Sequence, residues 1–179
     1  MPQLPAGLRT LTRVVRVLIL IGATVLACVP PLFWLQPDWV RVAGPQIANL
    51  GTGPIVVDER ALWLGALGSL PGMLLGLYTL WQLWRLFGEY AAGRFFAPAP
   101  QRHLRRFAWA VLAWALMAPL QRTWVALALT WGNPPGQRML VLGLSGDDYF
   151  SILLGAVLLA IATVLAEAAR VAEENEGFV

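Results

Sequence analysis

Residues 61–84 read ALWLGALGSLPGMLLGLYTLWQLW, and this stretch decides the fold class of the chain. It contains 24 residues and no charged side chain. A helix rises about 1.5 Å per residue, so a run of this length can cross the roughly 30 Å hydrocarbon core of a bilayer. The stretch therefore predicts a transmembrane helix.

Three other apolar runs extend this interpretation along the chain. Residues 17–35 and 149–166 contain no charged side chain, and residues 107–131 are apolar apart from Gln121 and Arg122. Each run is long enough to span a bilayer as a helix. We therefore expect an all-α integral membrane protein built as a four-transmembrane-helix bundle.

The composition agrees with a single membrane domain over residues 1–179. Apolar residues make up 58% of the chain and charged residues 13%, and the mean hydropathy is +0.64. A water-facing globule of this size could not hide so many apolar side chains. The nine Trp residues support the same conclusion, because the indole ring prefers the boundary between hydrocarbon and headgroups. Membrane lipid is therefore the first expected partner.

The basic residues are 13 Arg and no Lys, and most lie in short clusters at the ends of the apolar runs. Nucleic-acid binding needs a contiguous basic face, so we expect no direct nucleic-acid binding. The uneven distribution instead predicts that both termini and the loop between spans two and three are cytoplasmic. The arginines on that side are Arg9, Arg13, Arg16, Arg85, Arg94, Arg102, Arg105, Arg106 and Arg170, and those on the other side are Arg41, Arg60 and Arg138.

Cys28 and His103 are the single residues of their kinds, which excludes an internal disulfide and a His/Cys cluster for zinc or haem. The sequence has no H-E-x-x-H motif, phosphate-binding glycine loop or recognisable Ser/His/Asp set. We therefore expect no metal, no cofactor and no catalytic residues. The residues before Cys28 loosely resemble a lipoprotein cleavage box, but the apolar run continues to residue 35, so we expect this span to stay uncleaved.

Small residues in span two predict a helix-packing seam. Gly68, Gly72 and Gly76 follow each other at intervals of four residues, which places them on one helix face. A neighbouring backbone can approach closely at such a face. Ala156 and Ala160 repeat the pattern more weakly in the last span.

Arg122 is the most informative single residue, because it lies well inside an otherwise apolar span. An unpaired guanidinium in hydrocarbon is costly, so we expect Arg122 to face the bundle and pair with an acid. Asp147 and Asp148, at the start of the last span, are the candidate partners. A structural ion pair near the membrane surface is the favoured interpretation, and a substrate or proton site is the alternative.

The two loops on the non-cytoplasmic side contain β-prone runs at residues 54–58 and 138–145, bounded by Gly and Pro. Two such strands could pair, so we expect a small extracytoplasmic β-ribbon. A two-stranded ribbon alone is marginally stable and would need support from the bundle.

The cytoplasmic side combines a basic loop with an acidic tail. Gly93 is predicted to end the helix of span two, and residues 167–179 are predicted to continue the last helix beyond the membrane. A basic loop facing an acidic tail favours an interaction surface. Its candidate residues are Arg102, Arg105, Arg106, Glu173, Glu174 and Asn175.

Several segments resemble a bacterial membrane family known as domain of unknown function two-nine-seven-five. The similarity covers roughly residues 60–179 and is strongest in the E-E-N-x-x-F-V tail. The segments that carry it are LWRLFGEYAAGRFF, RHLRRFAW, GNPPG, SGDDYF and EAARVAEENEGFV. The resemblance implies four spans in a bacterial cytoplasmic (inner) membrane and no assigned catalytic residues. Its members are often encoded beside a helix-turn-helix regulator of the Xre type, which implies a soluble protein partner.

Three functional hypotheses follow. The first is a non-catalytic membrane protein that acts as an interaction or regulatory partner through its cytoplasmic face. The second is an accessory subunit of a larger membrane complex, suggested by the glycine seam and the many Trp residues. The third is a small transporter, which usually needs several polar groups converging inside the membrane.

Overall fold

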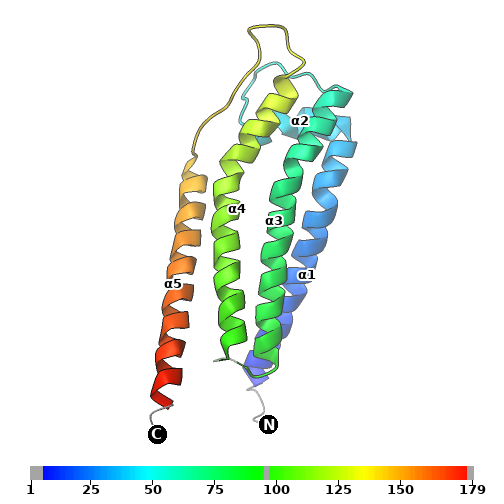
Figure 1. Ribbon diagram of the computed structural model, residues 1–179. Helices are drawn as coiled ribbons and strands as arrows, with labels where there is room; N and C mark the ends of the chain where they lie inside the picture. The colour runs from blue at the N-terminus through cyan, green and yellow to red at the C-terminus, as the bar shows by residue number, and fades with distance from the viewer. Residues whose placement is uncertain (1–5, 95–96, 177–179) are drawn as a thin grey trace.

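The computed structural model describes residues 6–94 and 97–176, and this part of the chain forms five α-helices (Figure 1). Beyond residue 171 only the helical backbone is described. The helices are α1 (Ala6–Leu35), α2 (Pro37–Ile47), α3 (Glu59–Ala91), α4 (Pro98–Thr130) and α5 (Gly146–Glu176).

Helices α1, α3, α4 and α5 are long and apolar enough to cross a membrane, so the chain is a multi-pass membrane protein. All four are longer than the apolar runs that predicted them, because polar sequence at their ends joins the helices. Asp58 begins α3, since its side chain accepts a hydrogen bond of 2.7 Å from the backbone N–H of Ala61. Gly93 follows the end of α3 with a φ of 76°, which confirms the predicted helix end.

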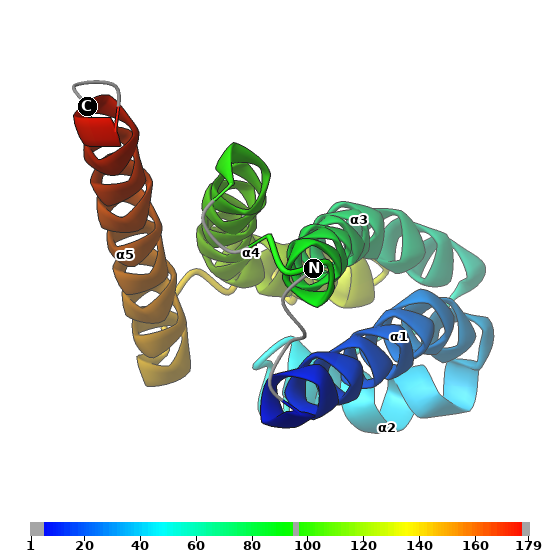
Figure 2. The same ribbon diagram turned by 90° about the horizontal axis from the view of Figure 1, so that it is seen from below.

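The four long helices form an open row in the order α1, α3, α4, α5 rather than a closed bundle. Helix α3 packs against α1 and α4, whereas α5 packs against α4 and makes no comparable contact with α1 or α3. Seen along the helices, α1 and α5 lie on opposite sides of the α3–α4 pair (Figure 2). One face of the row is consequently left open between α1 and α5.

The short helix α2 was not predicted from the sequence. Pro37 occupies its first turn, where a missing N–H costs nothing, and Val40 and Gly44 face inward. A Cβ atom built on Gly44 would lie 2.9 Å from a methyl group of Leu129 on α4. Leu129 and Val40 belong to a buried core cluster that also contains Trp34, Ala48, Leu50, Val125 and Ala126. The core therefore lies where α2 covers one end of the row.

The expected β-ribbon is wrong: the described residues contain no strand, and both loops instead bind the end of α4. The backbone N–H of Val56 donates to Leu129 O at 3.0 Å. The side chain of Asn133 donates to Pro54 O at 2.8 Å and to Gln137 O at 3.0 Å, linking the two loops. Hydrogen-bonding groups at the end of α4 thus replace the partners that a second strand would have supplied.

The glycines of α3 receive side chains from neighbouring helices rather than a close backbone. A Cβ atom on Gly68 would overlap the indole ring of Trp124, and one on Gly72 would overlap the carboxamide of Gln121. At Gly76 the nearest atom is a methyl carbon of Leu26, at 2.6 Å. Each missing Cβ therefore makes a notch for one large side chain.

The close backbone contact lies between α4 and α5. A Cβ atom on Gly155 would come within 2.8 Å of Leu112 Cα. Ala162, two turns further along α5, is also buried, whereas Ala156 and Ala160 are exposed. The expectation for those two alanines was therefore wrong, because the face of α5 that packs on α4 contains Asp148, Gly155 and Ala162.

Candidate functional site: an apolar cleft and a basic face

An ion pair joins α4 to the first turn of α5. The Arg122 guanidinium donates to both carboxylate oxygens of Asp148, at 2.7 Å and 3.0 Å. The Asp148 side chain is only 4% exposed and that of Arg122 only 21%. Such a bidentate pair gives both charges a partner away from water. Asp147, the other candidate acid, is exposed and accepts neither of these bonds.

Asp148 is held in place by a reciprocal cap at the start of α5. Its carboxylate accepts a hydrogen bond of 2.7 Å from the backbone N–H of Ser145, and its own N–H donates to the Ser145 hydroxyl at 3.1 Å. The motif S-x-x-D before an apolar run is the sequence signal for such a capping box. The sequence interpretation did not use this signal, which favours Asp148 over Asp147.

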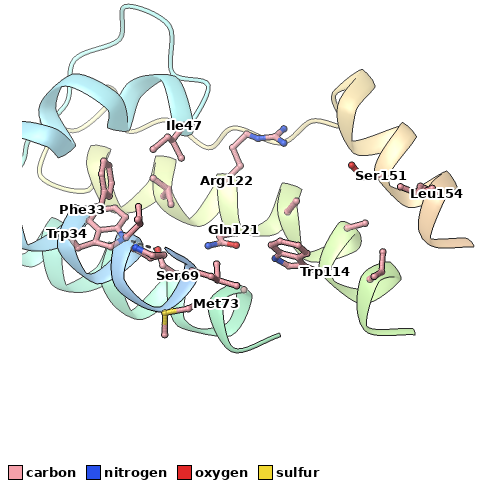
Figure 3. Close-up of a pocket in the computed structure, with 18 residues that line it drawn as sticks. Phe33, Trp34, Ile47, Ser69, Met73, Trp114, Gln121, Arg122, Ser151 and Leu154 are labelled. Atoms are coloured by element: carbon pink, nitrogen blue, oxygen red, sulfur yellow. Dashed lines mark hydrogen bonds between the residues drawn. The ribbon is translucent and has the colours of Figure 1, made fainter. Parts of the chain in front are cut away.

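Beside this ion pair, the open face of the row contains a cleft of about 700 Å³ (Figure 3). Phe33, Trp34, Ser69 and Met73 form one wall, and Trp114, Arg122 and Leu154 belong to the other helices around it. Residues of α1, α3, α4 and α5 all contribute, and Ile47 of α2 lies at one end. Most of the lining is aliphatic or aromatic, so the cleft is an apolar space with a few polar groups.

The polar groups of the cleft differ in how well they are hydrogen-bonded. The Ser69 hydroxyl accepts from Trp34 Nε1 at 2.8 Å and donates to Gly65 O at 2.8 Å, so it is fully engaged. The carboxamide of Gln121 lies across Gly72 and has no hydrogen-bond partner within the described residues. Ser151 of α5 also lines the cleft and is exposed. Gln121 and Ser151 are therefore two polar groups of the lining that are available to a ligand.

A basic face lies at the end of the row where α1 begins and α5 ends (Figure 1). Arg102, Arg105 and Arg106 occupy the first turns of α4, and all three are exposed. Arg105 and Arg106 form neither an ion pair nor a hydrogen bond with any other described residue. Arg94 differs, because it pairs with Glu89 at 2.6 Å, and this hydrogen bond raises the pKa of Arg94.

The acidic half of the predicted interaction surface lies outside the described side chains. Glu173, Glu174 and Asn175 belong to the final turns of α5, of which only the helical backbone is described. Nearer the membrane, Glu167 pairs with Arg170 on the same helix at 2.5 Å. The three exposed arginines of α4 are therefore the part of this surface whose geometry is established.

A buried polar pair near the basic face was missed in the sequence. His103 Nδ1 lies 2.8 Å from Gln82 Oε1, joining α4 to α3. Gln82 is fully buried, and its Nε2 has no partner among the described residues. The only sequence signal was a lone Gln in an apolar run, which does not identify its partner. Across the same part of the chain, no three His, Cys, Asp or Glu residues cluster as metal ligands would.

The family model described as "Protein of unknown function (DUF2975)" matches residues 44–178, so the chain belongs to this family. The match begins nearer the N-terminus than the segments that carried the resemblance and includes the end of α2. No curated protein and no solved structure matches the chain.

Proposed function

We propose that this protein is a non-catalytic bacterial membrane protein that binds an acidic soluble protein through its basic face in the cytoplasm. The observation that carries the proposal is the exposure of Arg105 and Arg106 without an ion-pair partner among the described residues. Exposed cations that are not held in an ion pair attract acidic surfaces and speed their association.

The distribution of arginine supports the cytoplasmic placement of this face. Arg13, Arg16 and Arg85 lie at the same end of the row as the three exposed arginines of α4. The opposite end carries Arg41, Arg60 and Arg138. An excess of Arg on one side of a multi-pass protein orients that side toward the cytoplasm.

Site-specific photo-crosslinking in living cells tests the proposal. A photoreactive amino acid at position 105 is expected to capture a soluble protein, whereas the same residue at Arg138, on the opposite end, should capture none. Replacing Arg102 and Arg106 with Gln should reduce the yield of the adduct at position 105 about tenfold, as expected when two charges at the edge of an interface are removed.

The matched control replaces Arg41 and Arg60 with Gln, which removes the same charge from the other end and should leave the adduct unchanged. Adducts at position 105 that contain lipid alone would overturn the proposal. So would an adduct whose yield is equal in the two double variants.

A further inference from the structure

The cleft on the open face has the size and lining of a small-molecule site. Its volume of about 700 Å³ lies within the roughly 300–1,000 Å³ range of ligand pockets. Such pockets are mainly apolar and contain a few convergent polar groups. Here these groups are the carboxamide of Gln121 and the hydroxyl of Ser151, which come from different helices.

The position of the mouth indicates where a ligand would come from. The cleft lies on the side where α1 and α5 do not meet, and its rim includes Val29 of α1 and Leu154 of α5. Both side chains are about half exposed, at 51% and 58%. Because α1 and α5 are membrane-spanning helices, this opening faces the hydrocarbon of the bilayer. A ligand that enters here is therefore dissolved in the membrane.

The charges around the cleft favour a ligand with an uncharged head group over one with an ionic head group. Among the residues that the structure describes, Arg122 is the only charged one in the lining, and both of its terminal nitrogens already donate to Asp148. Asp148 therefore neutralises the charge of Arg122, so the lining offers an anionic head group no unpaired positive charge. Gln121, in contrast, can both donate and accept hydrogen bonds without any change of charge.

The carboxamide of Gln121 has no hydrogen-bond partner within the described residues, so a hydrogen bond to it would add to the binding free energy of a ligand. Leaving such a group unpaired away from water costs free energy that a hydrogen bond recovers. Gly72 leaves room for the Gln121 carboxamide at this position, because any Cβ atom on residue 72 would overlap it. The head of a ligand would therefore meet Gln121 near the middle of the cleft, with its chain along the apolar wall.

We propose that the cleft binds an uncharged amphiphile from the lipid bilayer, with its hydroxyl or carbonyl head hydrogen-bonded to Gln121. The test uses the full-length protein purified in detergent, with monooleoylglycerol as the probe. A photoreactive monoacylglycerol is expected to label residues of the cleft, and unlabelled monooleoylglycerol should compete. Oleate and dioleoylphosphatidylglycerol have the same hydrocarbon chains and anionic heads, so they should compete at least tenfold less well.

Two variants separate the polar contact from the shape of the cleft. Gln121→Leu keeps the size of the side chain and removes its hydrogen bonds, so it should weaken competition by monooleoylglycerol about tenfold. Ala118→Leu adds bulk to the lining and should reduce labelling. Ala113→Leu adds the same bulk at an exposed position of α4 outside the lining and should leave labelling unchanged.

Three results would overturn the proposal. The first is equal competition by the anionic lipids, which would mean that the head is not selected. The second is unchanged labelling in both Gln121→Leu and Ala118→Leu, which would place the probe elsewhere. The third is co-purification of a membrane protein whose helix crosslinks to residues of the cleft, which would mean that a protein fills it. Elution volume and thermal stability without probe identify any variant that fails to fold.

Discussion

Arg122 and Asp148 form the one ion pair that joins two long helices in the described part of the chain. In the sequence, Arg122 lies well inside an otherwise apolar span, and in the structure it lies eight residues before Thr130, the last residue of α4. Its partner Asp148 is the third residue of α5, so Arg122 lies level with the first turn of that helix. The pair therefore anchors the first turn of α5 to α4.

Arg122→Leu is expected to destabilise the protein by about 3 kcal/mol, because it leaves the buried carboxylate of Asp148 without its cation. Asp148→Asn should also be destabilising, and the double variant should lose less than the sum of the two. Asp147→Asn is the matched control and should change stability by less than about 0.5 kcal/mol, since Asp147 is exposed. The measurement is a double-mutant cycle on unfolding in detergent. Strict additivity of Arg122→Leu and Asp148→Asn would contradict a coupled pair.

The glycines of α3 give a second prediction at this scale. Gly68→Ala should lower the free energy of unfolding by about 2 kcal/mol, because its Cβ atom would displace the Trp124 indole and its 2.8 Å hydrogen bond to Leu64 O. Gly88→Ala, in the same helix, meets no atom within 4 Å and should stabilise by up to about 1 kcal/mol through helix propensity. Thermal unfolding of the two variants provides the comparison. Equal effects on thermal stability would show that the space left by Gly68 for Trp124 does not stabilise the protein.

At the scale of elements, the loops and α2 account for most of the difference between expectation and structure. Residues 54–58 and 138–145 have the composition of strands, and β-propensity predicted a ribbon from it. Whether two such runs pair depends on which partners lie nearby. Here Thr123 Oγ1 donates to Val141 O at 2.6 Å, so α4 binds the second loop directly.

Asn133 should be the residue on which the arrangement of these loops depends. Asn133→Ala removes one hydrogen bond between the two loops and one within the second loop, and it leaves two carbonyl groups without a partner, at a cost of about 2 kcal/mol. Gln137→Ala, an exposed neighbour in the same loop, should cost less than about 0.5 kcal/mol. Limited proteolysis of the two variants in detergent measures opening of this region. Cleavage at equal rates would show that Asn133 does not hold the loops.

Helix α2 was not predicted from the sequence, because the residues that stabilise it are distant in the chain. Residues 37–47 contain two Pro and one Gly, which in isolation favour a loop. The helix forms because Val40 and Gly44 pack against Leu129, more than eighty residues away in the chain. Tertiary burial here overrides local propensity.

For the whole molecule, hydropathy alone was enough to predict four spans. A segment that crosses a bilayer must form its backbone hydrogen bonds within itself, and a helix does so. The length and apolarity of each run therefore identify the helices. The way the helices pack could not be derived in this manner. The lone Gln121 and the Gly72 notch become a site only once α3 and α4 are placed together, and the open face follows from α5 having a single neighbour.

The orientation of the four spans is the central claim, since the cytoplasmic placement of the basic face depends on it. Cysteine labelling of intact cells tests it in a Cys28→Ala background. Thr52→Cys and Gly143→Cys lie in exposed loops at one end, and Ala92→Cys follows α3 at the other. A membrane-impermeant maleimide should label the first two in intact cells and Ala92→Cys only after permeabilisation. Labelling of Ala92→Cys in intact cells, with protection of the other two, would contradict the account.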